Sequence, residues 1–209
     1  VRSRGLGDVY KRQAYSDLKY PLYVVNAPEI MVEAVRLGKE DILPLLAAQK
    51  IFWASEKFSK KNFFQVQKKI QLPIERNKKE VLPLNLKEFF PEKYGIIFLQ
   101  LDTFLEDKWS RYPKALLQVT EFGITAKFSP ENNIVWVTEL GSGRPVPEVA
   151  IQVRDDANKI HWKGKTDERG LVETPGWKAL GIKSQSRWSQ PQQWIFAAKG
   201  DDFTFRSSE

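Results

Sequence analysis

Few residues of this chain could carry out chemistry. His161 is its only histidine and cysteine is absent. Any Ser-His-Asp triad would need His161, but its neighbours Ile160 and Trp162 are typical of an ordinary strand position. No nucleophile or orienting acid is indicated by the surrounding pattern, so we expect a structural role for this histidine. The lack of cysteine excludes disulfides and thiolate chemistry within these residues.

Two pairs of adjacent aspartates, Asp155-Asp156 and Asp201-Asp202, are the candidate metal ligands. Calcium binding requires several converging oxygen ligands, and neither pair has the spaced D-x-[DN]-x-[DN]-G pattern. We interpret both pairs as turn residues. The sequence also lacks a Gly-rich phosphate loop, zinc-ligand spacing and a paired-carboxylate motif. We therefore assign no catalytic, cofactor-binding or metal-binding residue, expect no cofactor, and interpret the chain as non-enzymatic.

One segment mixes basic and aromatic side chains in a way that could contact phosphates and stack on bases. Aromatic residues of a β-sandwich usually belong to its core, and lysines are common on edge strands, where they oppose aggregation. We therefore expect no nucleic-acid partner. The residues concerned are Lys57, Lys60, Lys61, Lys68 and Lys69, interleaved with Phe58, Phe63 and Phe64.

The first residues, Val1 to Gln13, differ in character from the rest of the chain. VRSRGLGDVYKRQ resembles a translated sequencing adaptor, and we expect it to contribute no strand. It holds four basic residues and one acidic residue, so its removal lowers the formal charge from +7 to +4. On this interpretation the natural chain begins near Ala14.

No apolar run anywhere in the 209 residues approaches the ~20 residues that span a bilayer, so we expect no direct membrane insertion of this chain.

The length of 209 residues suits two sandwiches of about 100 residues each. In the first half we predict strands over 18–25, 30–37 and 94–101, and a half-buried strand that includes Phe64, Val66 and Ile70. One helix is predicted over 41–52, with Asp41 as its N-cap and Pro44 in its first turn.

The second half alternates more clearly. Val149, Ile151 and Val153 alternate with Ala150, Gln152 and Arg154, which predicts one face on a core and the other in water. Three turn-forming segments are expected to close hairpins, 175–193 to be a long loop, and WIFAA, at 194–198, to be a core strand. The three turns are 141–145, 155–158 and 166–170.

The order of these phrases resembles the N-terminal macroglobulin-like domains of bacterial alpha-2-macroglobulins. The matching phrases are V-W-V-T-x-L at 135–140, S-G-x-P-V at 142–146, V-x-I-x-V at 149–153 and T-D-x-x-G-L at 166–171, preceded by an entry strand at 117–127. Tyr20 to Leu37 and Leu82 to Leu101 resemble the opening and the close of the preceding domain of the same family.

The resemblance implies an all-β chain of two consecutive macroglobulin-like (fibronectin/immunoglobulin-like) antiparallel β-sandwich domains with one short helix. We place them at 14–117 and 118–209, with truncation of the second at its C-terminal end left open.

The resemblance also implies a framework fragment of a broad-spectrum protease (endopeptidase) inhibitor, which traps proteases after cleavage of a bait segment. Bait and Cys-x-Glu-Gln thioester would lie outside these residues. The implied partners are target proteases, through the full-length protein, and neighbouring domains of the same chain, and the implied location is periplasmic or extracellular.

Two alternatives use the same fold. One is a binding or structural module of a surface adhesin or stalk. The other is an accessory domain of a carbohydrate-active enzyme, indicated only by Trp177 and Trp188.

Overall fold

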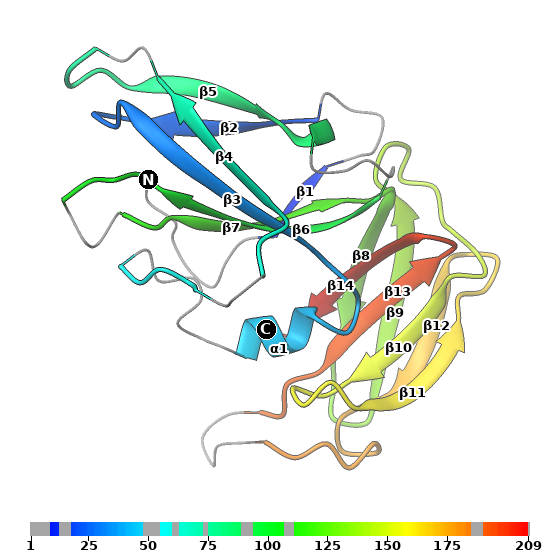
Figure 1. Cartoon of the computed structure of the whole chain (residues 1–209). Helices are drawn as coiled ribbons and strands as arrows, with labels where there is room; N and C mark the ends of the chain where they lie inside the picture. The colour runs from blue at the N-terminus through cyan, green and yellow to red at the C-terminus, as the bar shows by residue number, and fades with distance from the viewer. Residues whose placement is uncertain are drawn as a thin grey trace. The chain divides into compact units, whose positions relative to one another are not determined.

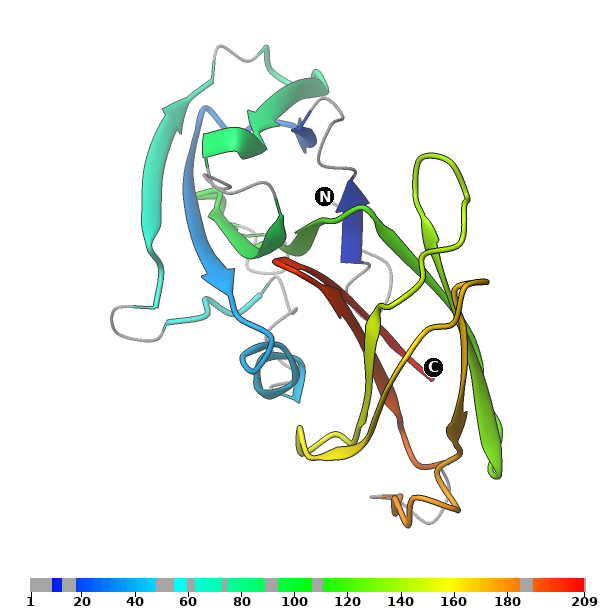
Figure 2. The ribbon, with the colours of Figure 1, turned by 90° about the vertical axis from the view of Figure 1, so that its right-hand side faces the viewer.

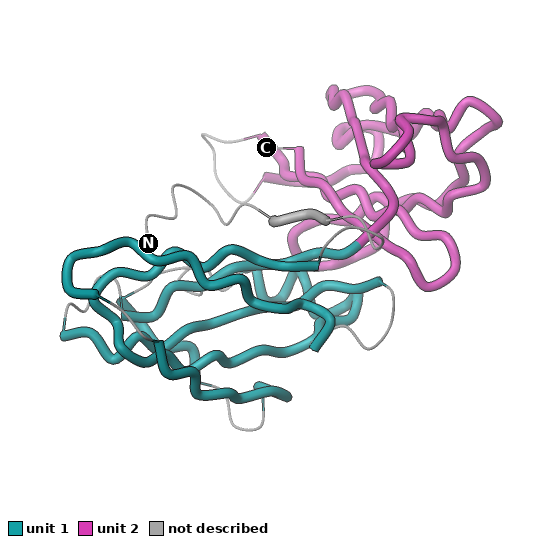
Figure 3. Tube along the Cα trace, turned by 90° about the horizontal axis from the view of Figure 1, so that it is seen from above, with its two compact units in different colours: residues 1–119 teal, residues 120–209 magenta. Residues whose placement is uncertain are grey.

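The computed structural model of the chain describes residues 9–12, 18–47, 55–59, 63–72, 75–88, 94–106, 111–184 and 190–208. The chain divides into two units, Val1–Val119 and Thr120–Glu209, coloured separately in Figure 3. Strands dominate both, which confirms the predicted all-β class. The natural limits of the two domains stay a prediction. No helix in the described part of the chain is long and apolar enough to cross a membrane.

Unit 1 is built on a five-stranded sheet, in which neighbouring strands are antiparallel except for one parallel pair (Figure 1). A separate antiparallel pair forms a second layer. The large sheet has the order β1 (Val9–Arg12), β7 (Lys114–Val119), β6 (Gly95–Asp102), β3 (Glu29–Leu37) and β4 (Val66–Gln71); the pair consists of β2 (Lys19–Val24) and β5 (Glu80–Asn85).

The N-terminal segment differs from expectation, because Val9–Arg12 form β1 and pair in parallel with β7. An edge strand exposes unpaired backbone donors and acceptors, and an extended segment can satisfy them whatever its side chains are. The adaptor-like origin of residues 1–13 stays a prediction.

The core of unit 1 lies between its two layers. Alternate residues of β3 and β6 point toward the β2–β5 pair because successive side chains of a strand face opposite ways. This cluster includes Ile30, Val32, Ala34, Ile97, Leu99 and Leu101 from the large sheet, and Leu22, Val24 and Leu84 from the pair. Every residue of β6 is buried, so its second face is covered as well.

Aromatic rings gather on that second face. Phe98 of β6 is fully buried, and the rings of Phe58, Phe63 and Phe64 surround it with centroid distances of 5.8, 6.2 and 6.2 Å. The phenylalanines of the basic and aromatic segment are therefore part of the packing of unit 1.

Helix α1 spans Ile42–Ala47, whereas the sequence predicted 41–52; residues 48–52 lie outside the described part of the chain. The carbonyl of Asp41 accepts the N–H of Leu45, as expected of an N-cap residue. Its carboxylate accepts from the N–H of Gly38 at 2.9 Å instead of from the helix. A short 3₁₀ helix, η2 (Leu86–Glu88), follows β5.

Unit 2 is a sandwich of two antiparallel sheets, which Figure 2 shows as opposing layers. The first sheet has the order β11 (Ile160–Lys165), β10 (Ala150–Arg154), β13 (Trp194–Lys199) and β14 (Asp202–Ser207). The second has the order β12 (Leu171–Pro175), β9 (Asn132–Glu139) and β8 (Phe122–Lys127).

The alternation predicted for β10 is confirmed on its core side and wrong at one position on the other. Val149, Ile151 and Val153 are fully buried between the sheets. Arg154, predicted to face water, is only 1% exposed. Its guanidinium carbon lies 4.5 Å from the ring centroid of Phe196, and its nitrogens donate to the side chains of Gln152 and Asn158. A buried guanidinium is tolerated because its donors are satisfied.

Two of the three predicted hairpin turns are confirmed. Residues 155–158 close a hairpin between β10 and β11, and residues 141–145 fold the chain back on β9, where Thr138 and Pro145 form an antiparallel bridge, before it continues to β10. The third prediction is wrong, because residues 166–170 lead from β11 to β12, which belong to different sheets. The predicted loop over 175–193 begins at the end of β12; its Trp177 packs against the core, and Trp188 lies outside the described residues.

The turn at 166–170 is fastened to its surroundings by Thr166, which is 2% exposed. Its hydroxyl donates to the carbonyl of Val146 at 2.8 Å and accepts from the N–H of Val149 at 3.0 Å. Asp167 closes the turn from within, since its carboxylate accepts from the backbone N–H of Leu171. That bond is the main cause that lowers the pKa of Asp167.

Gly170 allows the backbone of the turn to lie close to β9 and to Val146. Its φ is +69°, and a Cβ at this position would lie 2.5 Å from the carbonyl oxygen of Val137 and 2.9 Å from the nitrogen of Val146. The N–H of Val137 in turn donates to the carbonyl of Gly170 at 2.9 Å. The glycine of T-D-x-x-G-L is therefore required by both its backbone angle and the close approach of two chain segments.

We expect Gly170→Ala to destabilise the chain more than Gly143→Ala. Gly143 has a similar φ of +71°, but a Cβ there would meet nothing within 4 Å. Both variants pay ~1–2 kcal/mol for an alanine in the left-handed region, and only Gly170→Ala adds ~1–3 kcal/mol of steric overlap. Equal midpoints of urea unfolding for the two variants would contradict the proposed close approach.

Candidate functional site

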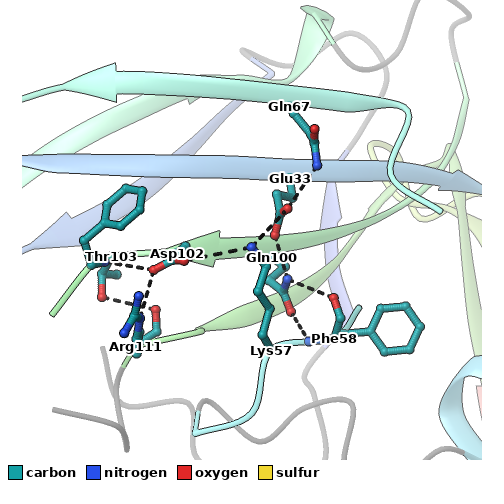
Figure 4. A network of polar contacts seen from close by, with 9 residues as sticks. Glu33, Lys57, Phe58, Gln67, Gln100, Asp102, Thr103 and Arg111 are labelled. Carbon is teal, nitrogen blue, oxygen red and sulfur yellow. Dashed lines mark hydrogen bonds and ion pairs between the residues drawn. The ribbon is translucent and has the colours of Figure 1, made fainter. Parts of the chain in front are cut away.

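A buried polar cluster lies on the second face of the large sheet of unit 1 (Figure 4). Glu33 of β3 and Gln100 of β6 are register partners, and Asp102 lies two residues further along β6. Side chains two apart on a strand share a face, and directly opposed residues touch across it. Their exposed fractions are only 4%, 0% and 5%.

Gln100 uses both ends of its amide. Its Oε1 accepts from the N–H of Phe58 at 2.8 Å, and its Nε2 donates to the carbonyl of Phe58 at 3.2 Å and to Glu33 at 2.8 Å. The other oxygen of Glu33 accepts from Gln67 of β4 at 3.1 Å. One buried amide thus fastens the segment 55–59 to the sheet.

Two cations balance the two carboxylates. Lys57 Nζ lies 3.4 Å from Glu33 and 3.9 Å from Asp102. Arg111 donates from Nε to Asp102 at 3.2 Å, and its carbonyl accepts from the backbone N–H and the hydroxyl of Thr103. The buried charges are therefore paired and hydrogen-bonded, which is the condition for their burial.

Lys114, at the start of β7, also holds backbone of the connecting segments against the sheet. Its Nζ donates to the carbonyls of Glu56 and Tyr112, one on each of the two connecting segments. Burial lowers the pKa of Lys114 to about 8, partly offset by the charge of Glu56. An amine with such a pKa can act as a nucleophile, but this one is engaged by two carbonyls.

The cluster is suited to holding chain segments and not to catalysis. Its carboxylates, amides and cations bind one another or the backbone, and it contains no hydroxyl or thiol nucleophile paired with a base. Sequence reasoning assigned no role to Glu33, Gln100 and Asp102. The available signal was a polar residue within each of two strands, EIMVEAVRL and GIIFLQLD, that are otherwise rich in apolar residues.

The histidine lies close to one of the predicted aspartates but forms no triad with it. His161 Nε2 is 2.7 Å from Asp155 Oδ2. Burial alone would raise the pKa of Asp155, but the bonds from His161 and from the N–H groups of Lys159 and Ala157 together lower it. These bonds tie the β10–β11 hairpin. Asp156 instead accepts from the indole N–H of Trp194 at 2.8 Å.

The second aspartate pair is also separated by the fold. Asp201 is exposed in the turn between β13 and β14, whereas Asp202 is 2% exposed. Asp202 Oδ2 accepts from the N–H of Glu121 at 2.8 Å, and its Oδ1 has no hydrogen-bond partner. Burial raises the pKa of Asp202. No group of three or more histidine, aspartate or glutamate side chains that could hold a metal occurs in the described ranges.

Three lysines of the basic and aromatic segment form ion pairs. Lys57 is paired as above, Lys68 lies 2.8 Å from Glu88, and Lys69 lies 2.8 Å from Glu29. Lys60 and Lys61 lie outside the described residues. These ion pairs and the packing of the phenylalanines around Phe98 indicate a structural role for the described part of this segment, and the expectation of no nucleic-acid partner stays a prediction.

Comparison with known families decides the identity of unit 2. Residues 119–209 match the family model described as "Bacterial alpha-2-macroglobulin MG3 domain". Unit 2 is a bacterial macroglobulin domain. The resemblance indicated by the sequence motifs is thereby confirmed. No curated protein sequence matches the chain.

Solved structures extend the likeness in fold to nearly the whole chain. A fragment of native Escherichia coli alpha-2-macroglobulin spanning domains NIE-MG1 is 13% identical with a TM-score of 0.71, and the match covers 97% of this chain and 95% of that one. A fragment spanning MG0-NIE-MG1 is 14% identical with a TM-score of 0.68, with 97% and 63% covered.

The trypsin-activated alpha-2-macroglobulin of Escherichia coli is 12% identical with a TM-score of 0.65. That match covers 97% of this chain but only 13% of the other, so the chain spans a small part of the length of such a relative. At these identities the likeness establishes the fold alone.

We expect Glu33→Ala to destabilise unit 1 by ~1–3 kcal/mol, because the buried amide of Gln100 loses an acceptor and Lys57 loses its nearer carboxylate. Glu29→Ala is the matched control. Glu29 also lies on β3 and also bonds a glutamine and a lysine of β4, Gln71 and Lys69, but at the surface. Its replacement should change the unfolding midpoint much less. Equal effects of the two variants would show that burial of the cluster contributes nothing.

We expect Asp202→Asn to change how stability depends on pH. A carboxyl whose pKa is raised in the folded state stabilises the fold at pH values below its unfolded pKa, and this contribution is lost as pH rises through the folded pKa. The asparagine variant should therefore gain stability relative to wild type as pH rises from the unfolded pKa of the carboxyl through its raised folded pKa. Thermal unfolding at several pH values tests this, with Asp201→Asn as the exposed control. A constant difference across that range would contradict the prediction.

Proposed function

We propose that this chain is a framework part of a bacterial alpha-2-macroglobulin-like inhibitor of endopeptidases, which traps a protease after the protease cleaves a bait segment elsewhere in the parent protein. The observation that carries the proposal is the match of residues 119–209 to the bacterial MG3 domain family. The fold likeness across 97% of the chain to a structure titled as trypsin-activated supports it.

The physical character of the two units suits this role. A trap rearranges by moving rigid bodies, so each body must resist deformation. In unit 2 the turn at 166–170 is bonded through Thr166 to Val146 and Val149, before β10, and through Gly170 to Val137 of β9. In unit 1 the cluster around Gln100 fastens two connecting segments to the sheet. Both features favour structural work over chemistry.

The proposal assigns no catalysis to these residues, and it places the protease-binding elements in the rest of the parent protein. Such a protein would act in the periplasm or outside the cell, where it meets foreign proteases. The adhesin or stalk alternative uses the same sandwiches, and the sequence on either side of this segment separates the two.

The test begins with sequencing the genomic DNA on both sides of the reading frame and expressing the complete parent protein. Incubation with trypsin should change the mobility of the parent protein on a native gel relative to the untreated parent. Trypsin held by the parent should still cleave a small peptide substrate while losing most of its activity on a large protein substrate. Trypsin with a blocked active site is the control, since it cannot cleave a bait.

A parent made of tandem copies of this unit, with no change in trypsin activity, would contradict the inhibitor proposal and favour the stalk. A parent that binds blocked and active trypsin equally would contradict trapping by bait cleavage.

A further inference from the structure

Exposed large apolar side chains are concentrated on particular faces of the described residues. In unit 2 they are Ile134, Trp136 and Leu140, with 44%, 41% and 39% of their surface exposed. Ile134 and Trp136 point outward from β9 because Val135 and Val137 point into the core. We call the outer surface formed by Ile134, Trp136, Leu140 and Gly123 the Trp136 face.

The Trp136 face lies over the middle of a sheet. Strand β9 is flanked by β8 and β12, and Trp136 is the register partner of Thr125 on one side and of Leu171 on the other. A central position is where binding energy concentrates in protein interfaces, and tryptophan is the residue type most enriched there.

Contacts within the unit hold the Trp136 side chain in place. Its indole N–H donates to the carbonyl of Arg169 at 3.1 Å, within the turn that Gly170 ends. The polar atom of the ring is thus already satisfied, and the surface left for a partner is apolar. A ring that is fixed beforehand loses little conformational entropy on binding.

Gly123 and Leu140 extend the same surface. A Cβ on Gly123 would lie 3.1 Å from Leu140 Cδ2, so the leucine side chain lies against the bare backbone of β8. The surrounding polar residues are of both signs: Arg144 pairs with Glu139, and Arg169 pairs with Asp167. An apolar centre with an internally paired polar rim is the anatomy of a protein interface and offers no net charge to a polyanion.

We propose that the Trp136 face is the docking surface for another domain of the same parent polypeptide. This inference rests on the proposed function in one respect, that the parent is a multidomain macroglobulin. The length of the relative supports this occupant, since the match covers 13% of the trypsin-activated chain and leaves most of that polypeptide outside the segment. A tethered domain has a high effective concentration, so a modest apolar patch suffices to hold it.

Hydroxyl-radical footprinting with mass spectrometry tests the proposal, applied to this chain alone and to the complete parent. Phe104 is the internal reference, because it is 42% exposed and belongs to unit 1. In the isolated chain both side chains should be oxidised readily. In the parent, oxidation of Trp136 relative to Phe104 should fall at least fivefold, at every protein concentration tested.

A photo-crosslinking amino acid at position 134 of the parent identifies the occupant. Crosslinks within one polypeptide, to residues outside this segment, are the expected result. Equal oxidation of Trp136 in the isolated chain and the parent would overturn the proposal. So would protection that grows with the concentration of the isolated chain, which indicates a second copy, and so would crosslinks only to a different protein.

The two proposals fail separately. Protection of Trp136 in a parent that does not trap trypsin would retain the docking surface and reject the inhibitor. Trapping by a parent in which Trp136 stays fully reactive would do the reverse.

Discussion

Burial of strand β6 on both faces is the constraint on which unit 1 depends. One face meets the β2–β5 pair through Ile97, Leu99 and Leu101. The other must also be covered, and that face carries Phe98, Gln100 and Asp102. Buried polar groups cost several kcal/mol if they are left unpaired, so the strand dictates the presence of Glu33 beside it and of bonded backbone above it. Residues 55–59 and Arg111, in the described parts of the connections, are bonded to the sheet for the same reason.

In unit 2 the connections between the two sheets hold the sandwich together. A sandwich of two small sheets holds together only if the layers are tied, because each sheet alone has one apolar face. The connections that include 141–145 and 166–170 cross between the layers, and Thr166 bonds the backbone of the segment that follows the first turn. Two of the phrases that mark the family, S-G-x-P-V and T-D-x-x-G-L, therefore lie on the connections between the two sheets. Their residue types follow from backbone geometry and hydrogen bonding.

Much of this could be predicted from local pattern, and the exceptions share a cause. The alternation of Val149, Ile151 and Val153 correctly predicts which side chains enter the core. A period of two does not say which strand is the neighbour, so the turn at 166–170, which joins different sheets, was mistaken for a hairpin. Glu33 and Gln100 are 67 residues apart in sequence, and nothing local to either one indicates the other. Arg154 was predicted to face water because the aromatic ring that covers it, Phe196, belongs to β13, which neighbours β10 in the sheet but is distant from it in sequence.

The distribution of satisfied and unsatisfied groups bears on what the chain can do. Its buried carboxylates, amides and the guanidinium of Arg154 bind partners within their own units, with Asp202 Oδ1 as the exception among the described side chains. Groups so engaged are poorly available to a substrate, since binding it would first break bonds in a medium of low dielectric constant. The surface of unit 2 also carries the large exposed apolar side chains of Ile134, Trp136 and Leu140, and apolar surface acts by contact. These features support the framework role that we propose.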